Sequence, residues 1–244
     1  MYKVVAINSS KRKKFTYGVM KQVSDILIQH QIEVEFVHLF DYQIDSCIGC
    51  ECCILKGDCV RKDEMQLLMK KLEDCDGIIL SSPVYLQSVS GMLKTFLDRT
   101  CVWFHRKALS GKPMLTISTT KGSGLEGTLD YLDCVVTQWG GYQTGRIGRT
   151  IRNVDHAVSE KECQKFIESI QMDKSDYKPR WESVKNYQVQ KVLSRKLVDL
   201  DRKYWDERGW DKQVYYFDCR INPLKKVGGN LLYSFLNRVI KAVD

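Results

Sequence analysis

The 244-residue sequence contains no apolar run that approaches the about 20 residues of a membrane-spanning helix. Its first residues show no charged segment followed by an apolar stretch and a small-residue cleavage site, so we expect a cytoplasmic protein without a transmembrane segment. No internal repeat and no low-complexity segment is present. The four histidines are scattered and show neither a metal-ligand spacing nor a nucleophile–base arrangement. The chemistry of this chain must therefore be sought in other residue types.

The net charge of +8 is unevenly distributed along the chain. Residues 1–171 hold 22 Lys/Arg and 20 Asp/Glu, whereas residues 172–244 hold 16 and 10. The basic excess of the C-terminal part favours an anionic partner there, such as an acidic protein or a lipid surface. A solvated helical surface explains the same charges equally well. We expect no nucleic-acid partner.

Short apolar runs alternate with helical patterns along residues 1–171. Strands are predicted at 3–8, 33–39, 77–81, 113–118 and 140–148. Helices are predicted at 16–30, 63–72, 91–104, 126–138 and 159–170, the last opened by a capping-box pattern of Ser159 and Glu162. This alternation, with nearly continuous apolar strands, predicts a parallel sheet covered by helices on both faces. The fold class is α/β, a doubly wound five-stranded parallel sheet of the flavodoxin-like type, which binds ligands at the carboxyl ends of its strands.

The character of the chain changes after Lys178-Pro179. Residues 180–212 are rich in Lys, Arg, Asp, Trp and Tyr in a helical pattern. A final helix is predicted, with one broad apolar face made of Leu231, Leu232, Phe235, Leu236, Val239 and Ile240. We therefore divide the chain into a domain at 1–171, with a cysteine-rich loop at 43–62, and a helical C-terminal extension at 172–244, which we expect to contact a second copy or a partner.

Four of the ten cysteines follow the spacing C-x2-C-x2-C-x5-C, and these are Cys47, Cys50, Cys53 and Cys59. Four thiolates so close in sequence suit an iron–sulfur cluster or a tetrahedral zinc ion, and the spacing leaves both open. Cys52 also lies in the run, although the two-residue spacing favours Cys53 as the ligand. The remaining cysteines occur singly and are predicted to be small buried apolar residues: Cys75, Cys101, Cys134, Cys163 and Cys219.

Three loops at strand ends contain candidate binding residues. The loop at 8–16 joins a buried strand to a helix N-terminus, where free amides favour a phosphate, and it adds hydroxyls and positive charge from Ser9, Lys11, Arg12 and Thr16. It lacks the glycines of the dinucleotide and P-loop fingerprints. The loop at 81–91 contributes Ser82, Pro83, Val84, Tyr85 and Ser88. The loop at 119–124 contributes Thr119, Thr120, Gly122 and Gly124, whose glycines allow the backbone to approach a ligand closely.

These loops resemble those of the flavodoxin-like NAD(P)H-dependent FMN reductase family. Ser9-x-Lys11 with Thr16 is similar to the family's phosphate loop, G-S-x-R-x-x-x-x-T, with Asn8 and Lys11 in place of the glycine and arginine. The most specific similarity lies in Ser82-Pro83-Val84-Tyr85, Ser90-Gly91, Lys94 and Asp98-Arg99. The cysteine loop, with Gly49 and Gly57, resembles that of the family's iron–sulfur flavoprotein branch. The resemblance covers roughly residues 1–170.

The resemblance implies an FMN-dependent oxidoreductase. It implies FMN bound by the three loops, a 4Fe-4S cluster on the four loop cysteines, and electron exchange between cluster and flavin in a homo-oligomer, a dimer or tetramer. The electron donor or acceptor would be NAD(P)H or a redox partner protein. We expect no dedicated catalytic acid–base pair. Two alternatives remain: an NAD(P)H-dependent FMN or quinone reductase without a working cluster, and a non-enzymatic electron carrier.

Overall fold

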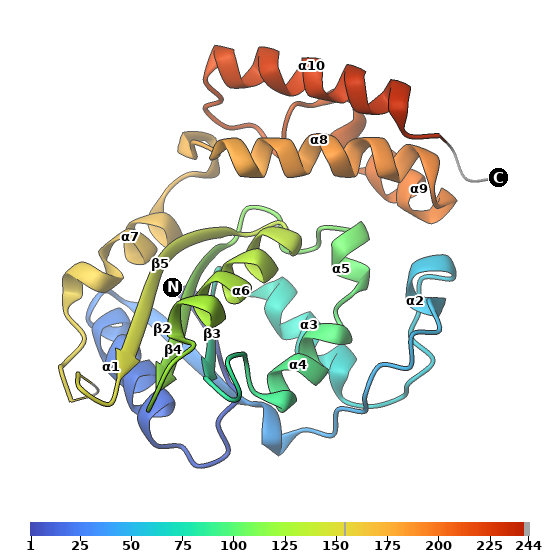
Figure 1. Cartoon of the computed structure of the whole chain (residues 1–244). Helices are drawn as coiled ribbons and strands as arrows, with labels where there is room; N and C mark the ends of the chain where they lie inside the picture. Colours follow the sequence, from blue (N-terminus) through green and yellow to red (C-terminus); the bar gives the residue numbers. More distant parts are fainter. Residues whose placement is uncertain (154, 242–244) are drawn as a thin grey trace.

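The computed structural model describes residues 1–153 and 155–241. At its centre is a parallel five-stranded sheet with the strand order β2-β1-β3-β4-β5 (Figure 1). The strands are β1 (Tyr2–Asn8), β2 (Ile32–His38), β3 (Gly77–Pro83), β4 (Pro113–Thr120) and β5 (Tyr142–Thr150). The chain reverses its direction of strand addition between β1 and β3, which creates the switch point at which such sheets bind ligands. The predicted doubly wound α/β fold class is confirmed.

Helices cover both faces of the sheet (Figure 1). One face packs against α1 (Phe15–Gln29) and α7 (Glu160–Gln171). The other packs against α3 (Met65–Asp74), α4 (Gly91–Asp98), α5 (Val102–His105) and α6 (Leu125–Gln138). Successive side chains of a strand point to opposite faces, so the fully buried run Val4–Ile7 of β1 contributes to both apolar cores. This burial explains why the strands are nearly continuous apolar runs.

The single helix predicted at 91–104 is wrong, because α4 ends at Asp98 and α5 begins at Val102. The Thr100 hydroxyl donates to the Leu97 carbonyl at 2.7 Å and accepts from the Trp139 indole N–H at 2.9 Å. Side-chain bonds of this kind compete with the backbone ladder of a helix. The predicted capping box at Ser159 and Glu162 is confirmed.

The cysteine loop follows β2 directly. A 3-10 turn, η1 (Leu39–Asp41), leads into it, and its only helical turn before α3 is α2 (Cys52–Leu55). Gly49 and Gly57 have φ values of +67° and +88°, in the left-handed region where glycine is favoured. Both glycines, one on each side of α2, thus adopt a backbone conformation that other residues rarely adopt.

The extension is helical and has an aromatic core of its own. Its elements are η2 (Lys174–Asp176), α8 (Trp181–Lys196), α9 (Asp199–Glu207), η3 (Trp210–Lys212) and α10 (Pro223–Val239). Tyr187, Trp205 and Tyr216 lie at the centre of this core. The helix α10 packs on α8 on the side away from the sheet (Figure 1). The domain division at 171/172 stays a prediction, and residues 242–244 of the predicted extension lie outside the described residues.

Across 1–153 and 155–241, no helix has both the length and the apolar character required to cross a membrane.

Candidate functional site

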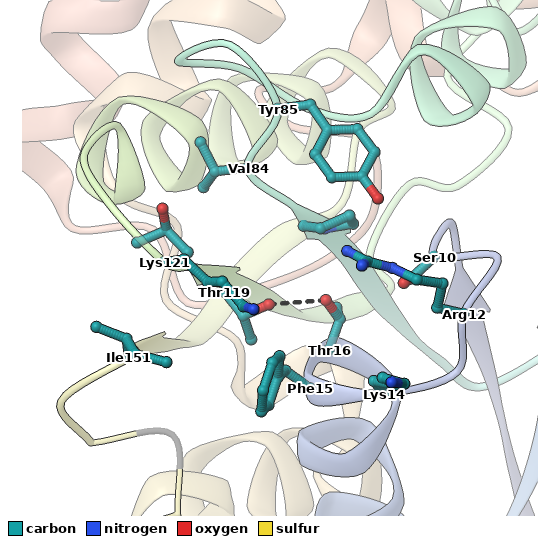
Figure 2. A pocket seen from close by; sticks show the side chains of 12 residues that line it. Ser10, Arg12, Lys14, Phe15, Thr16, Val84, Tyr85, Thr119, Lys121 and Ile151 are labelled. Atoms are coloured by element: carbon teal, nitrogen blue, oxygen red, sulfur yellow. Dashed lines mark hydrogen bonds between the residues drawn. The ribbon is translucent and has the colours of Figure 1, made fainter.

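A cavity of about 290 Å³ lies where β1, β3 and β4 end (Figure 2). We call it the strand-end cavity. It is lined by Ser10, Arg12, Lys14, Phe15, Thr16, Pro83, Val84, Tyr85, Thr119, Thr120, Lys121 and Ile151. Three of these residues are cationic and none is acidic. The cavity therefore favours an anionic ligand, at the place where a doubly wound sheet is expected to bind one.

The loop after β1 brings an uncapped helix N-terminus to this cavity. No side chain caps α1, and its first turn contains no acidic residue. The first amides of a helix lack intrahelical partners and carry partial positive charge. Arg12 and Lys14 lie in the same loop and line the cavity. Together, the amides and cations are suited to bind a phosphate group.

Asn8 braces this loop from within. Its side-chain oxygen accepts from the Ser10 amide at 3.2 Å, its side-chain nitrogen donates to the Ser10 carbonyl at 3.0 Å, and that nitrogen also lies 2.9 Å from His38 Nδ1. Asn8 is 1% exposed. The residue that replaces the family's glycine therefore fixes the path of the loop.

Two threonines join the first loop to the loop after β4. The hydroxyl oxygens of Thr16 and Thr119 lie 2.8 Å apart, and Figure 2 shows this bond on the side of the cavity opposite Tyr85. Tyr85 is held by a pair of backbone hydrogen bonds with Ser88, of 2.8 and 3.1 Å. Its ring remains about half exposed. The Tyr85 ring and the hydroxyls of Thr16 and Thr119 thus lie on opposite sides of the cavity. This arrangement suits a flat ring with a polar edge.

Seven of the predicted cofactor residues line the cavity: Arg12, Thr16, Pro83, Val84, Tyr85, Thr119 and Thr120. Six others are not part of the lining: Ser9, Lys11, Ser82, Ser88, Gly122 and Gly124. The Ser9 hydroxyl donates to the Ser81 carbonyl at 3.0 Å, and the Ser82 hydroxyl accepts from the Ser90 amide at 2.9 Å. These serines thus support the loops from behind. The cofactor role of all these residues stays a prediction.

Glycine is required at position 124 for a local reason. Gly124 has a φ of +87°, and a Cβ there would lie 2.9 Å from the Gln87 Cα. Gly124 therefore lets the loop after β4 pass close to the loop after β3.

Lys11 does not line the strand-end cavity. Its ammonium nitrogen lies 5.9 Å from the ring centre of Phe40 instead.

Sequence reasoning missed five lining residues: Ser10, Lys14, Phe15, Lys121 and Ile151. Ser10, Lys14 and Phe15 belong to the basic loop that was singled out, so its charge was a usable signal. The Lys121 ammonium lies 5.4 Å from the ring centre of Phe15, a contact between the loop after β4 and the start of α1 that no local pattern predicts. Ile151 follows β5 and had no sequence signal.

A second, smaller cavity of about 60 Å³ lies within the cysteine loop. All four predicted ligands, Cys47, Cys50, Cys53 and Cys59, line this cysteine cavity, and Cys52 does not. Neighbouring residues of a helix point about 100° apart, so Cys52 and Cys53 face different directions from α2. The four spaced thiols thus line one cavity, whereas Cys52 lies outside its lining and is hydrogen-bonded to the Cys50 thiol.

Cys101 is a fifth thiol in this cavity. It was predicted to be a small buried apolar residue, but it is partly exposed, and its sulfur lies 3.5 Å from that of Cys53. Its position in the break between α4 and α5 directs it to the loop. Burial and the nearby Cys53 thiol raise the pKa of Cys101 to about 12. In contrast, a hydrogen bond from the Cys52 amide lowers the pKa of Cys50.

Arg99 closes one side of the cysteine cavity. Its guanidinium binds the Asp63 carboxylate with both nitrogens, lies 3.5 Å from the Cys59 sulfur and donates to the Asp45 carbonyl at 2.7 Å. Burial alone would raise the pKa of the Asp63 carboxyl. Hydrogen bonds from Arg99 and from the amides of Asp45 and Met65 outweigh this effect and lower that pKa to about 2. A buried cation therefore stands beside the thiols.

The donor set of the cysteine cavity fits an iron–sulfur cluster in kind, because four thiols are its usual ligands. Within 1–153 and 155–241, no three His, Cys, Asp or Glu side chains are already gathered in a metal-binding group. The thiols therefore share a cavity but would have to move closer together to bind a common centre.

Comparisons with known proteins agree with this geometry. Residues 2–148 match the family model of NADPH-dependent FMN reductases. An iron–sulfur flavoprotein of Archaeoglobus fulgidus is 31% identical over 85% of this chain and 99% of its own length. An iron–sulfur flavoprotein of Clostridioides difficile is 25% identical over 84% of this chain and 98% of its own length.

Among solved structures, RosB with a bound 8-demethyl-8-formylriboflavin 5'-phosphate intermediate has a similar fold. Its TM-score is 0.56, over 91% of this chain and 92% of that one, with 12% sequence identity. At this identity the likeness concerns the fold alone, and it includes the part of this chain that follows the sheet.

Proposed function

The chain belongs to the NADPH-dependent FMN reductase family and is a flavin-dependent oxidoreductase, and we propose that its loop cysteines add a 4Fe-4S cluster to the FMN chemistry. When both groups are bound, FMN supplies two-electron or stepwise one-electron chemistry and the cluster supplies one-electron transfer. The protein would thus connect a two-electron reactant, such as NAD(P)H, to a one-electron partner.

One observation carries the cluster proposal. The four spaced thiols, and not Cys52, line a single cavity. The two full-length relatives described above are named iron–sulfur flavoproteins, which supports the same assignment. Zinc remains the competing occupant, since four thiolates also suit it.

On the flavin side, the chain's own residues bind and orient the cofactor. Arg12, Lys14 and the first amides of α1 would hold the phosphate, as cations and N–H donors do at other helix N-termini. Tyr85 would cover the ring, while Thr16 and Thr119 hold the opposite side of the cavity together. No dedicated acid–base pair is invoked.

Metal analysis under strict exclusion of air tests this proposal. We expect about four irons per chain, together with a broad absorption shoulder beside the flavin bands. Stoichiometric zinc, or no metal in the anaerobic protein, would contradict the cluster. In that case the protein is an NAD(P)H-dependent FMN or quinone reductase without a cluster, and steady NAD(P)H oxidation with quinone would continue.

We further propose that the protein assembles into a homo-oligomer through α10. This helix leaves a stripe of large apolar side chains exposed: Leu224, Val227, Leu231, Phe235 and Val239. Its opposite face packs on α8, where a Cβ at Gly228 or Gly229 would lie 3.1 Å from Trp181 or Val184. An apolar stripe of this kind marks an interaction surface, and a second copy would cover it with the same stripe.

Light scattering on a charged variant tests this assembly. Phe235→Asp should lower the molar mass in solution to that of a smaller species. Ile28→Asp, at an exposed apolar position on α1, is the matched control and should not change the mass. An unchanged mass for Phe235→Asp would rule out α10 as the contact.

A further inference from the structure

The extension contacts the cysteine loop through a buried carboxylate, Asp201. Asp201 lies in α9, is 2% exposed, and accepts from Arg106 Nε at 2.9 Å. Its other carboxylate oxygen lies 2.8 Å from His105 Nδ1. Burial of a carboxylate is costly unless it is paired and hydrogen-bonded. This acid is therefore held by the last residue of α5 and the residue after it, almost a hundred positions earlier in the chain.

The other edge of Arg106 binds the cysteine loop. Its two terminal nitrogens donate to the carbonyls of Cys53, at 3.0 Å, and of Ile54. Both carbonyls belong to α2, and the last carbonyls of a helix lack partners within it. Arg106 is 8% exposed, so its guanidinium is nearly enclosed between the loop and α9.

The same two elements also come close at a second place. Gly57 ends the turn after α2, and a Cβ at this position would lie 3.9 Å from the Leu200 side chain. Leu200 immediately precedes Asp201 in α9. The extension therefore lies against the loop at two places, at α2 through Arg106 and near Gly57 through Leu200.

We infer that Asp201 is a positioning residue for the cysteine site, and that the extension is a structural part of that site. Asp201 orients Arg106, and Arg106 fixes α2 by two carbonyls so that Cys53 rather than Cys52 faces the cavity. Because adjacent residues of a helix are about 100° apart, a rotation of α2 by about that angle would exchange these two thiols. The measurements of iron described below rest on the proposed cluster, whereas hydrogen exchange of the α2 amides does not.

Hydrogen exchange of α2 amides in Asp201→Asn tests this inference. The amides of Ile54, Leu55 and Lys56 are hydrogen-bonded within α2 and report its opening. In FMN-loaded protein we expect them to exchange about tenfold faster in the variant, because Arg106 loses its charged partner. Asp199→Asn is the matched control: it lies on the same helix, its side chain is 91% exposed, and its ion pair is with Arg202 on its own helix.

The anaerobic protein gives a second readout. The electron paramagnetic resonance spectrum of the reduced cluster and the half-life of bound iron in air should change in Asp201→Asn and not in Asp199→Asn, with FMN content equal in both. If Asp201→Asn does not fold, Arg106→Lys takes its place, since lysine keeps the charge but not the planar donor set.

The two proposals fail differently. If all variants lack iron but Asp201→Asn still speeds the exchange of α2, the cluster is wrong and the positioning role stands. If iron is present and Asp201→Asn changes neither the exchange rates nor the spectrum, the positioning role is overturned and the cluster stands.

Discussion

The strand-end cavity and the cysteine cavity are held in place by different means. Three loops that leave adjacent strands form most of the first, so the sheet itself positions its residues. The second lies in a long irregular loop whose one helical turn is α2. Two arginines hold that loop. Arg99 pairs with Asp63, and Arg106, which pairs with Asp201 of α9, donates to carbonyls of α2. Backbone topology thus builds one site, and buried ion pairs build the other.

Substitution of single cysteines should show most clearly that iron and FMN bind at separate sites. Cys53→Ser should lose the iron of the cluster and keep FMN, because one of four thiol ligands is gone. Cys52→Ser should keep both, since Cys52 does not line the cavity. Iron and flavin content of the two anaerobic proteins, measured side by side, decides this. Equal iron loss in both variants would contradict Cys53 as the ligand, and loss of FMN in Cys53→Ser would show that the two sites depend on each other.

The ion pair of Asp63 predicts an acid-sensitive cysteine loop. The folded-state pKa of Asp63 is about 2, below its ordinary 3.8, so the carboxylate stabilises the fold above about pH 4. This contribution, on the order of 2 kcal/mol, is lost as the pH falls from about 4 through about 2.

Urea unfolding of iron-free protein at several pH values measures this effect. Between pH 5 and pH 2, the free energy of unfolding should fall by about 2 kcal/mol more in the parent chain than in Asp63→Asn. Parallel pH dependences of the two proteins would show that Asp63 does not stabilise the loop in this way.

Removal of one cation should weaken FMN binding in the strand-end cavity and leave the iron content of the cysteine cavity unchanged. Arg12→Ala should lower FMN affinity about tenfold, because a charge-assisted hydrogen bond to the phosphate is lost. Its neighbour Lys11 does not line the cavity, so Lys11→Ala should have a smaller effect. Fluorescence titration with FMN measures both affinities, and iron content should not change. A larger loss in Lys11→Ala would reassign the phosphate contact.

The sheet was predictable from sequence, because its inner strands β1, β3 and β4 are buried on both faces and read as short apolar runs. Val4–Ile7 in β1 and Ile78–Leu80 in β3 are fully buried and are visible as such in the sequence. The cysteine spacing likewise identified four of the five thiols that share the second cavity. These are local signals, each contained within a few residues.

What holds the cysteine cavity was not predictable, because its contacts join residues far apart in sequence. Asp201 and Arg106 are separated by 95 positions, and Cys101 and Cys53 by 48. Neither an aspartate in a charged helix nor a lone cysteine carries a pattern that indicates its partner. The break between α4 and α5 was also missed, although it places both Arg99 and Cys101 at the loop.

A reductive titration of the anaerobic protein measures whether one chain holds both the flavin and the cluster. An FMN takes up two electrons and a 4Fe-4S cluster takes up one, so the account predicts about three electrons per chain, with the flavin and cluster absorptions bleaching in the same molecule. Uptake of about two electrons, with only the flavin bands bleaching, would contradict it.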